Sequence, residues 1–278
     1  MSPDAFTPHQ APKSTGALKD GAIRLPYGDD AAHFGDLRLP AGPGPHRVAA
    51  LIHGGGWQAI HHLDLMDPVA EDLTARGWAT WNIEYRRLGQ AGGGWPGTFL
   101  DASRAVDHLA TLASKHDLDL GRVVAVGHSA GGHLVLWLAA RPRIPAVSRL
   151  ATGPAPFRLA GVVSLAGSSD LARMWSLRPE RMSALMGGTP SEVPDRYAVI
   201  SPIEMLFLGV PQILVHGTDD RSVPVELSRD YVARARAAGD EARLVELPGV
   251  DHFAVIYPPA AAWARTLEAL AGLGSRPA

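Results

Sequence analysis

Apolar residues along this chain follow two alternating patterns. Short continuous apolar runs, such as residues 47–53 and 122–127, have the length of strands and are rich in Val, Leu and Ala. Between such runs apolar residues return at helical intervals, most clearly over residues 97–116. Continuous apolar strands are typical of a parallel sheet that helices bury on both faces. The pattern therefore predicts an α/β fold.

The order of the elements predicts one sheet of about eight strands, mostly parallel, with helices on both faces. Two strands, over residues 22–27 and 32–39, open the fold without a helix between them, so we expect an antiparallel edge. Further strands are predicted over residues 47–53, 78–85, 122–127, 159–165, 211–216 and 242–247. Helices are predicted over residues 67–76, 97–116, 130–141, 226–238 and 259–273.

Two segments depart from this alternation. Residues 1–20 are polar and contain prolines, and we expect them to form a flexible N-terminal arm outside the fold. Residues 21–278 then form a single domain. Within it, residues of about 168–209 interrupt the strand–helix rhythm and contain Met174, Trp175 and several prolines. This stretch predicts a small helical cap inserted into the domain.

Composition narrows the classes of function. The 278 residues carry a net charge of −2, so no basic field attracts nucleic acid or an anionic membrane, and we expect neither as a partner. There is no cysteine, which excludes disulfides, thiolate metal sites and a cysteine nucleophile. The first residues contain no apolar stretch typical of a secretory leader, so we expect a cytoplasmic protein.

A candidate nucleophile lies in the sequence GHSAGG, residues 127–132, directly after a predicted strand and at the start of a predicted helix. Small residues around Ser129 permit the sharp turn that lifts a serine hydroxyl out of the backbone. The helix that follows provides free N–H groups and a favourable dipole for developing negative charge. The alternative is a glycine-rich turn whose serine has no chemical role.

The sequence HGGGW, residues 53–57, ends another predicted strand. Consecutive glycines allow backbone N–H groups to approach a ligand, which suits an oxyanion hole. We expect Gly55, Gly56 and Ala130 to donate these hydrogen bonds. A phosphate-binding loop is the alternative, but it typically continues with Lys and Ser or Thr, whereas Trp57 follows here.

Two later strands end in residues that can complete a catalytic triad. The sequence HGTDDRSVP, residues 216–224, contains two adjacent acids, Asp219 and Asp220, either of which can orient a histidine. The last predicted strand is followed by a loop that contains His252, a candidate general base and acid. Ligands of open α/β sheets bind at the carboxyl ends of the strands, where all these residues lie.

With these motifs the chain resembles the α/β-hydrolase superfamily, and within it the esterase/lipase branch with an HGGGW motif, which includes kynurenine formamidase (arylformamidase)-like esterases. The resemblance extends from about residue 22 to 273 and rests on HGGGW, GHSAGGHL, HGTDDRSVP and DHF in this order. It implies a sheet of about eight strands. It also implies a triad of Ser129, Asp220 and His252, because the family pattern places the acid three residues after the glycine. His128 stands where related lipases commonly have Asp.

These observations predict a serine hydrolase of the carboxylesterase type that cleaves small acyl esters without a metal or organic cofactor. Three alternatives remain open. The first is an arylformamidase, or a hydrolase of arylamides or small peptides. The second is a non-catalytic small-molecule receptor on the same fold. The third is a metal hydrolase, whose candidate ligands match no familiar spacing: His61, His62, Asp64 and Asp67.

The expected partner is a small-molecule ester or amide substrate. Trp57 directly follows the candidate oxyanion glycines, and Trp95 lies in a glycine-rich loop, so we expect both to line the substrate pocket. Large side chains near the reacting carbonyl predict a preference for short acyl groups. The sequence leaves the oligomeric state open, a homodimer included.

Overall fold

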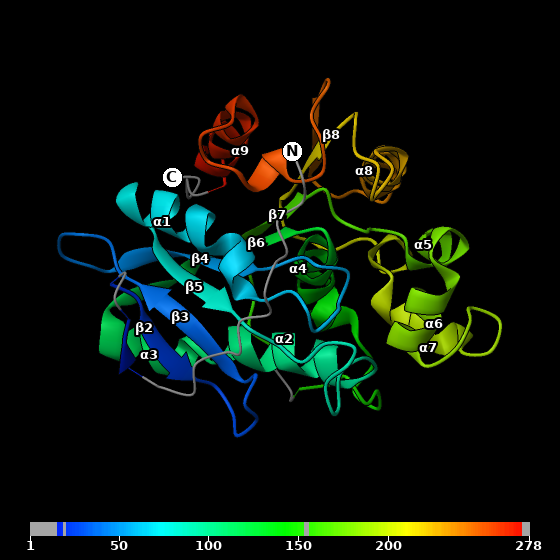
Figure 1. The fold of residues 1–278 in the computed structure, drawn as a ribbon, viewed down its shortest axis with the longest axis horizontal. Helices are drawn as coiled ribbons and strands as arrows, with labels where there is room; N and C mark the ends of the chain where they lie inside the picture. Colours follow the sequence, from blue (N-terminus) through cyan, green and yellow to red (C-terminus); the bar gives the residue numbers. More distant parts are fainter. Residues whose placement is uncertain (1–15, 19–20, 153–155, 274–278) are drawn as a thin grey trace.

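The computed structural model describes residues 16–18, 21–152 and 156–273. In this part of the chain one nine-stranded sheet forms the central layer, in the order β1-β2-β3-β5-β4-β6-β7-β8-β9 (Figure 1). The strands are β1 (Gly16–Ala17), β2 (Ile23–Pro26), β3 (Phe34–Arg38), β4 (His46–Ile52), β5 (Ala79–Ile83), β6 (Leu118–His128), β7 (Gly161–Leu165), β8 (Gln212–Gly217) and β9 (Ala242–Leu247). The helices are α1 (Asp67–Ala75), α2 (Gly97–Asp107), α3 (Leu109–His116), α4 (Ala130–Ala140), α5 (Leu171–Leu177), α6 (Pro179–Met186), α7 (Pro194–Ile200), α8 (Glu226–Ala237) and α9 (Ala261–Ala271).

The sheet is mostly parallel, as predicted. The six strands from β5 to β9 pair in parallel, while β1, β2 and β3 form the expected antiparallel edge. A ninth strand adds to the eight that were predicted: Gly16 and Ala17 pair with β2 inside the segment expected to be a flexible arm. Two residues are too few to give a strand pattern in the sequence. Residues 1–15 and 19–20 of that arm lie outside the described part of the chain.

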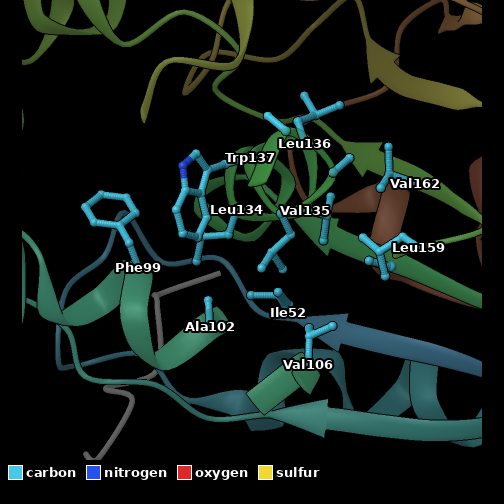
Figure 2. Close-up of a cluster of buried hydrophobic side chains, with 14 of the residues drawn as sticks. Ile52, Phe99, Ala102, Val106, Leu134, Val135, Leu136, Trp137, Leu159 and Val162 are labelled. Atoms are coloured by element: carbon cyan, nitrogen blue, oxygen red, sulfur yellow. The ribbon is translucent and has the colours of Figure 1, made fainter. Parts of the chain in front are cut away.

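Helices cover both faces of the sheet. On one face α1 and α9 pack against the central strands, where Leu51, Val126 and Val215 are buried. On the other face α2, α3, α4 and α8 form a larger core. Figure 2 shows part of this core, in which Phe99 of α2 and Trp137 of α4 pack edge to face with their ring centroids 5.5 Å apart. No helix in the described residues is long and apolar enough to span a membrane.

All residues of helix α4, from Ala130 to Ala140, are buried. This burial explains why its sequence is almost entirely apolar. Its first turn lies directly on the ends of β4 and β6. A Cβ atom at position 131 would lie 2.0 Å from the carbonyl oxygen of Ile52, and one at position 127 would lie 2.2 Å from that of Gly131. Only glycine fits at these two positions, and this close contact brings the start of α4 next to the end of β4.

The segment expected to form a cap contains α5, α6 and α7 between β7 and β8. Figure 1 shows these three helices as a yellow-green group beside one end of the sheet. Their apolar side chains, including Met174, Met182 and Leu185, are buried against the rest of the fold. The segment is therefore packed onto the domain.

We expect Gly131→Ala to lower the free energy of unfolding by about 1–3 kcal/mol, because the added methyl group overpacks the contact with β4. Gly272→Ala is the control, since a Cβ there meets only the carbonyl oxygen of Ala269 at an ordinary 3.5 Å. Urea unfolding of both variants measures the difference. Equal stability of the two variants would contradict the close α4 contact.

Candidate active site

Ser129 lies at the turn between β6 and α4, in a backbone conformation that L-residues rarely adopt. Its φ is 54° and its ψ is −112°. The turn is held by the hydrogen bond from the Ser129 N–H to the carbonyl oxygen of Leu165, 2.8 Å long, and by the glycines on either side. Strain of this kind persists only where the surroundings enforce it, and it presents the Ser129 side chain to a cavity of about 530 Å³.

His252 follows β9, lines the same cavity and contacts a buried carboxylate. Its Nδ1 lies 2.6 Å from Oδ2 of Asp220. The other oxygen of Asp220 accepts hydrogen bonds from the backbone N–H groups of Ser222 and Val223. Because a carboxylate only accepts, Nδ1 of His252 carries the proton and Nε2 is left free to act as a base.

A second histidine also holds Asp220. Nε2 of His216 lies 3.1 Å from Oδ2 of Asp220 and 2.9 Å from the carbonyl oxygen of Val223, so it donates. Nδ1 of His216 contacts the hydroxyl of Ser228 at 2.7 Å. Burial alone would raise the pKa of Asp220, but the hydrogen bonds from His216, His252 and Val223 outweigh it and hold that pKa well below its usual range. Asp220 is therefore ionised at neutral pH.

The two acids of the HGTDD sequence have different surroundings. Asp219 accepts a hydrogen bond from the Thr218 hydroxyl, and its backbone N–H donates to Val250. It makes no contact with His252 among the described residues. The structure thus brings Asp220, and not Asp219, together with His252.

The glycine loop after β4 lies beside Ser129 and lines the same cavity. Gly55 and Gly56 line the cavity with φ values of 101° and 60°, which favour glycine. In the described part of the chain the backbone N–H groups of Gly55, Gly56 and Ala130 have no hydrogen-bond acceptor. An oxyanion hole requires unsatisfied donors near the nucleophile; Gly55 and Gly56 share the cavity with Ser129, and Ala130 directly follows it in the chain.

A buried ionic cluster fixes this loop from behind. Oε1 of Glu84 lies 3.0 Å from Nε2 of His53 and 2.8 Å from a guanidinium nitrogen of Arg87. The hydroxyl of Tyr85 donates to the carbonyl oxygen of His53 at 2.9 Å. Burial would raise the pKa of Glu84, but the charges and hydrogen bonds of His53, His62 and Arg87 keep it well below its usual range. The role of these residues was not predicted from the sequence, although charged residues directly after a buried strand were a signal.

His128 connects the nucleophile turn to the loop of His252. Its Nε2 donates to the carbonyl oxygen of His252 at 2.9 Å. Burial and the charge of His252 lower the pKa of His128 to about 3, so this side chain is neutral at physiological pH. A neutral donor here fixes the backbone of His252, and that role was not apparent from the sequence.

The two tryptophans expected in the substrate pocket have different locations. Trp57 lines the cavity, although its indole is almost fully buried and packs edge-on against His133. Trp95 does not line this cavity. It packs against Phe99 and the guanidinium of Arg196, so its predicted place in the pocket is wrong. The sequence indicated a glycine-rich loop but not the direction in which the loop folds.

The remaining wall of the cavity combines apolar, hydroxyl and cationic side chains. Several come from α5 and α6, which close one side. The described residues contain no group of three His, Asp or Glu side chains that could hold a metal ion. The further lining residues are Gln58, His61, Leu65, Ser168, Met174, Arg178, Arg181, Met182, Ser222, Val223 and Phe253.

The chain matches a known protein family and resembles solved structures. Residues 36–234 match the model of the BD-FAE family, which is more than half of the 278-residue chain. Among solved structures, a truncated form of a carbohydrate esterase from gut microbiota superimposes with a TM-score of 0.80 at 20% identity, covering 94% of this chain and all of that one. At this identity the similarity shows the fold, which is that of the α/β-hydrolases.

Two curated relatives bear on the chemistry. Esterase LipC of Mycobacterium tuberculosis is 29% identical over 278 residues, covering 91% of this chain. Kynurenine formamidase avaC of Aspergillus versicolor is 27% identical over 215 residues, covering 65% of this chain and 72% of its own length. The chain spans between 49% and 66% of the length of LipC and four further curated esterases and ester hydrolases.

The buried state of His128 predicts a measurable dependence of stability on pH. Below its ordinary pKa of 6.5 the unfolded chain binds a proton at this side chain, whereas the folded chain does so only near pH 3. His128 therefore lowers the free energy of unfolding by about 1.4 kcal/mol per pH unit as the pH falls from about 6 to about 4.

His128→Gln keeps an N–H donor and removes the titration. We expect the free energy of unfolding of this variant to fall less steeply with decreasing pH than that of the wild type. Urea titrations at several pH values in this window measure both slopes. Identical slopes would show that His128 is not held neutral in the fold.

Proposed function

Because this chain belongs to the BD-FAE family and has the α/β-hydrolase fold, we propose that it is a serine hydrolase of the carboxylesterase type that cleaves small acyl esters. The observation that carries the proposal is the 2.6 Å contact between His252 and Asp220 at the cavity that Ser129 lines. Nucleophile, base and acid follow three different strands: Ser129 and His252 line one cavity, and Asp220 lies behind His252, which is the order that acyl transfer by a triad requires.

In the proposed reaction the Ser129 hydroxyl attacks the carbonyl carbon of the ester while Nε2 of His252 takes the hydroxyl proton. Asp220 holds the imidazole in the tautomer that leaves Nε2 unprotonated, and its negative charge stabilises the imidazolium that forms. The hydrogen bonds that keep Asp220 ionised support this role, because a protonated acid would offer no such charge.

The negative charge that develops on the carbonyl oxygen requires donors that are already in place. The N–H groups of Gly55, Gly56 and Ala130 suit this need, since none of them has an acceptor in the described part of the chain. The N-terminus of α4 adds a favourable dipole at the same point. The buried cluster of Glu84, His53 and Arg87 supports the proposal by holding the glycine loop in place.

Collapse of the tetrahedral intermediate breaks the ester C–O bond, and His252 returns the proton to the leaving alkoxide. The acyl group stays on Ser129. Water then attacks this acyl-enzyme with His252 again as base, which releases the carboxylic acid and restores the serine. The chemistry needs no further group beyond this chain and water.

The cavity favours a small substrate. At about 530 Å³ it suits a ligand of modest size, and Trp57, Met174, Met182 and Phe253 provide apolar walls. We propose that short acyl chains and flat leaving groups fit best, with α5 and α6 acting as the cap. A formamide is a second candidate substrate, because the chain covers 72% of the kynurenine formamidase relative and the same triad attacks an amide carbonyl.

Hydrolysis of a series of para-nitrophenyl esters, run beside N-formylkynurenine, tests the proposal. We expect kcat/KM for the acetyl or butyryl ester to exceed that for the decanoyl ester by about tenfold or more, because the cavity limits the acyl chain. Ser129→Ala should lower kcat by about a thousandfold or more while the protein stays folded. A Ser129→Ala variant that keeps more than about a tenth of the activity would overturn the nucleophile assignment.

The two neighbouring acids provide a matched pair of variants. Asp220→Asn should lower kcat by several orders of magnitude, because it removes the charge that orients His252. Asp219→Asn removes a carboxylate that does not touch His252, and we expect kcat within about threefold of the wild type. Steady-state kinetics on the acetyl ester compare them. A larger loss in Asp219→Asn would reverse the assignment.

A further inference from the structure

The cavity wall carries positive charge without a matching negative charge. Arg178 and Arg181 both line it, from the start and the first turn of α6, together with three histidines. Among the residues that the structure describes, no Asp or Glu lines it. Asp220, behind His252, is already engaged by His252 and His216.

The two guanidinium groups differ from other arginines of the fold. In the described residues Arg86, Arg141 and Arg173 each pair with an aspartate. Neither Arg178 nor Arg181 has a carboxylate within ion-pair distance in the same part of the chain; there the guanidinium of Arg178 donates only to the carbonyl oxygen of Leu177. The other guanidinium donors therefore remain available to a ligand.

Arg181 lies against the glycine loop. A Cβ atom at position 56 would lie 2.6 Å from a guanidinium nitrogen of Arg181, so this side chain lies against the α-carbon of Gly56. Gly56 is one of the proposed oxyanion donors. The guanidinium thus lies next to one of the residues that we propose to bind the carbonyl oxygen.

The pKa of the neighbouring His61 is lowered by burial and in part by the charge of Arg181. Its side chain lies beside Gly55 and lines the same wall. Burial, followed by the charges of His53, His62, Arg181 and Arg87, lowers the pKa of His61. His61 therefore tends to stay neutral, which leaves the two guanidinium groups as the permanent charges on this side of the cavity.

We propose that the substrate carries a carboxylate close to its scissile carbonyl, and that Arg181, assisted by Arg178, binds this carboxylate. The inference rests on the proposed esterase function and narrows its substrate class. Guanidinium groups bind carboxylates through paired, charge-assisted hydrogen bonds, and a cleft with walls of one charge sign concentrates ligands of the opposite sign. The cap helix α6 then selects the substrate as well as closing over it.

Matched pairs of esters of similar size, one anionic and one neutral, test the inference. For an anion on the leaving group, meta-acetoxybenzoate is compared with meta-acetoxybenzamide. For an anion on the acyl group, the para-nitrophenyl monoester of glutaric acid is compared with para-nitrophenyl pentanoate. In at least one pair we expect kcat/KM for the anionic ester to exceed that for the neutral one by about tenfold or more, and added salt to reduce this ratio.

The variant Arg178→Gln/Arg181→Gln should bring that ratio close to one. Because the ratio is measured on one protein preparation, a general loss of activity cancels from it. Arg173→Gln is the control: Arg173 lies on α5, pairs with Asp230 and does not line the cavity, so the ratio should stay at the wild-type value.

The outcomes separate the two proposals. If the neutral esters are hydrolysed and neither anionic ester is preferred, the carboxylate inference is overturned while the esterase function stands. If no ester is hydrolysed, the esterase function fails, and calorimetric binding of meta-acetoxybenzoate and meta-acetoxybenzamide to Ser129→Ala decides the inference. Tighter binding of the carboxylate supports it, and equal binding overturns it.

Discussion

The close contact between the first turn of α4 and the ends of β4 and β6 is the constraint on which the site depends. Glycine at positions 127 and 131 lets the helix approach so closely that any side chain would collide with the backbone of its neighbours. This approach forces Ser129 into its strained turn and places the N-terminus of α4 beside the glycine loop. The strain costs about 1–3 kcal/mol, which the fully buried α4 offsets through packing. The packing of α4 in the core thus maintains the strained turn that presents Ser129 to the cavity.

Around this contact, buried polar residues hold in place the glycine loop, Asp220 and the loop of His252. Glu84, His53 and Arg87 fix the glycine loop, while His216 and two backbone N–H groups fix Asp220. His128 joins the nucleophile turn to the loop of His252. Each of these buried groups has a partner of complementary charge or hydrogen-bonding character, so the arrangement avoids the cost of isolated buried charge. Preorganisation of this kind is what allows a few backbone N–H groups to stabilise an oxyanion.

The fold was predictable from the sequence because apolar runs of strand length alternate with helical periodicity, and the family resemblance is carried by short motifs at strand ends. The sequence also predicted that the site residues lie close together, because each follows a parallel strand and parallel strands have their carboxyl ends at one edge of the sheet. What escaped prediction depends on tertiary contacts. The two-residue strand β1 has no pattern of its own, Trp95 turns away from the cavity onto Phe99, and the roles of Glu84 and Arg181 arise only when distant segments meet. Propensity and periodicity describe local preference and do not report which way a loop folds.

We propose Ser129 as an activated nucleophile in a site that is assembled before substrate binds. Labelling with a fluorophosphonate probe, followed by mass spectrometry of the modified peptide, tests it most directly, because the probe needs the nucleophile, the base and the oxyanion donors at once. We expect stoichiometric modification of Ser129 in the folded wild type and none after denaturation. An unlabelled folded protein, or a label on another residue, would contradict it.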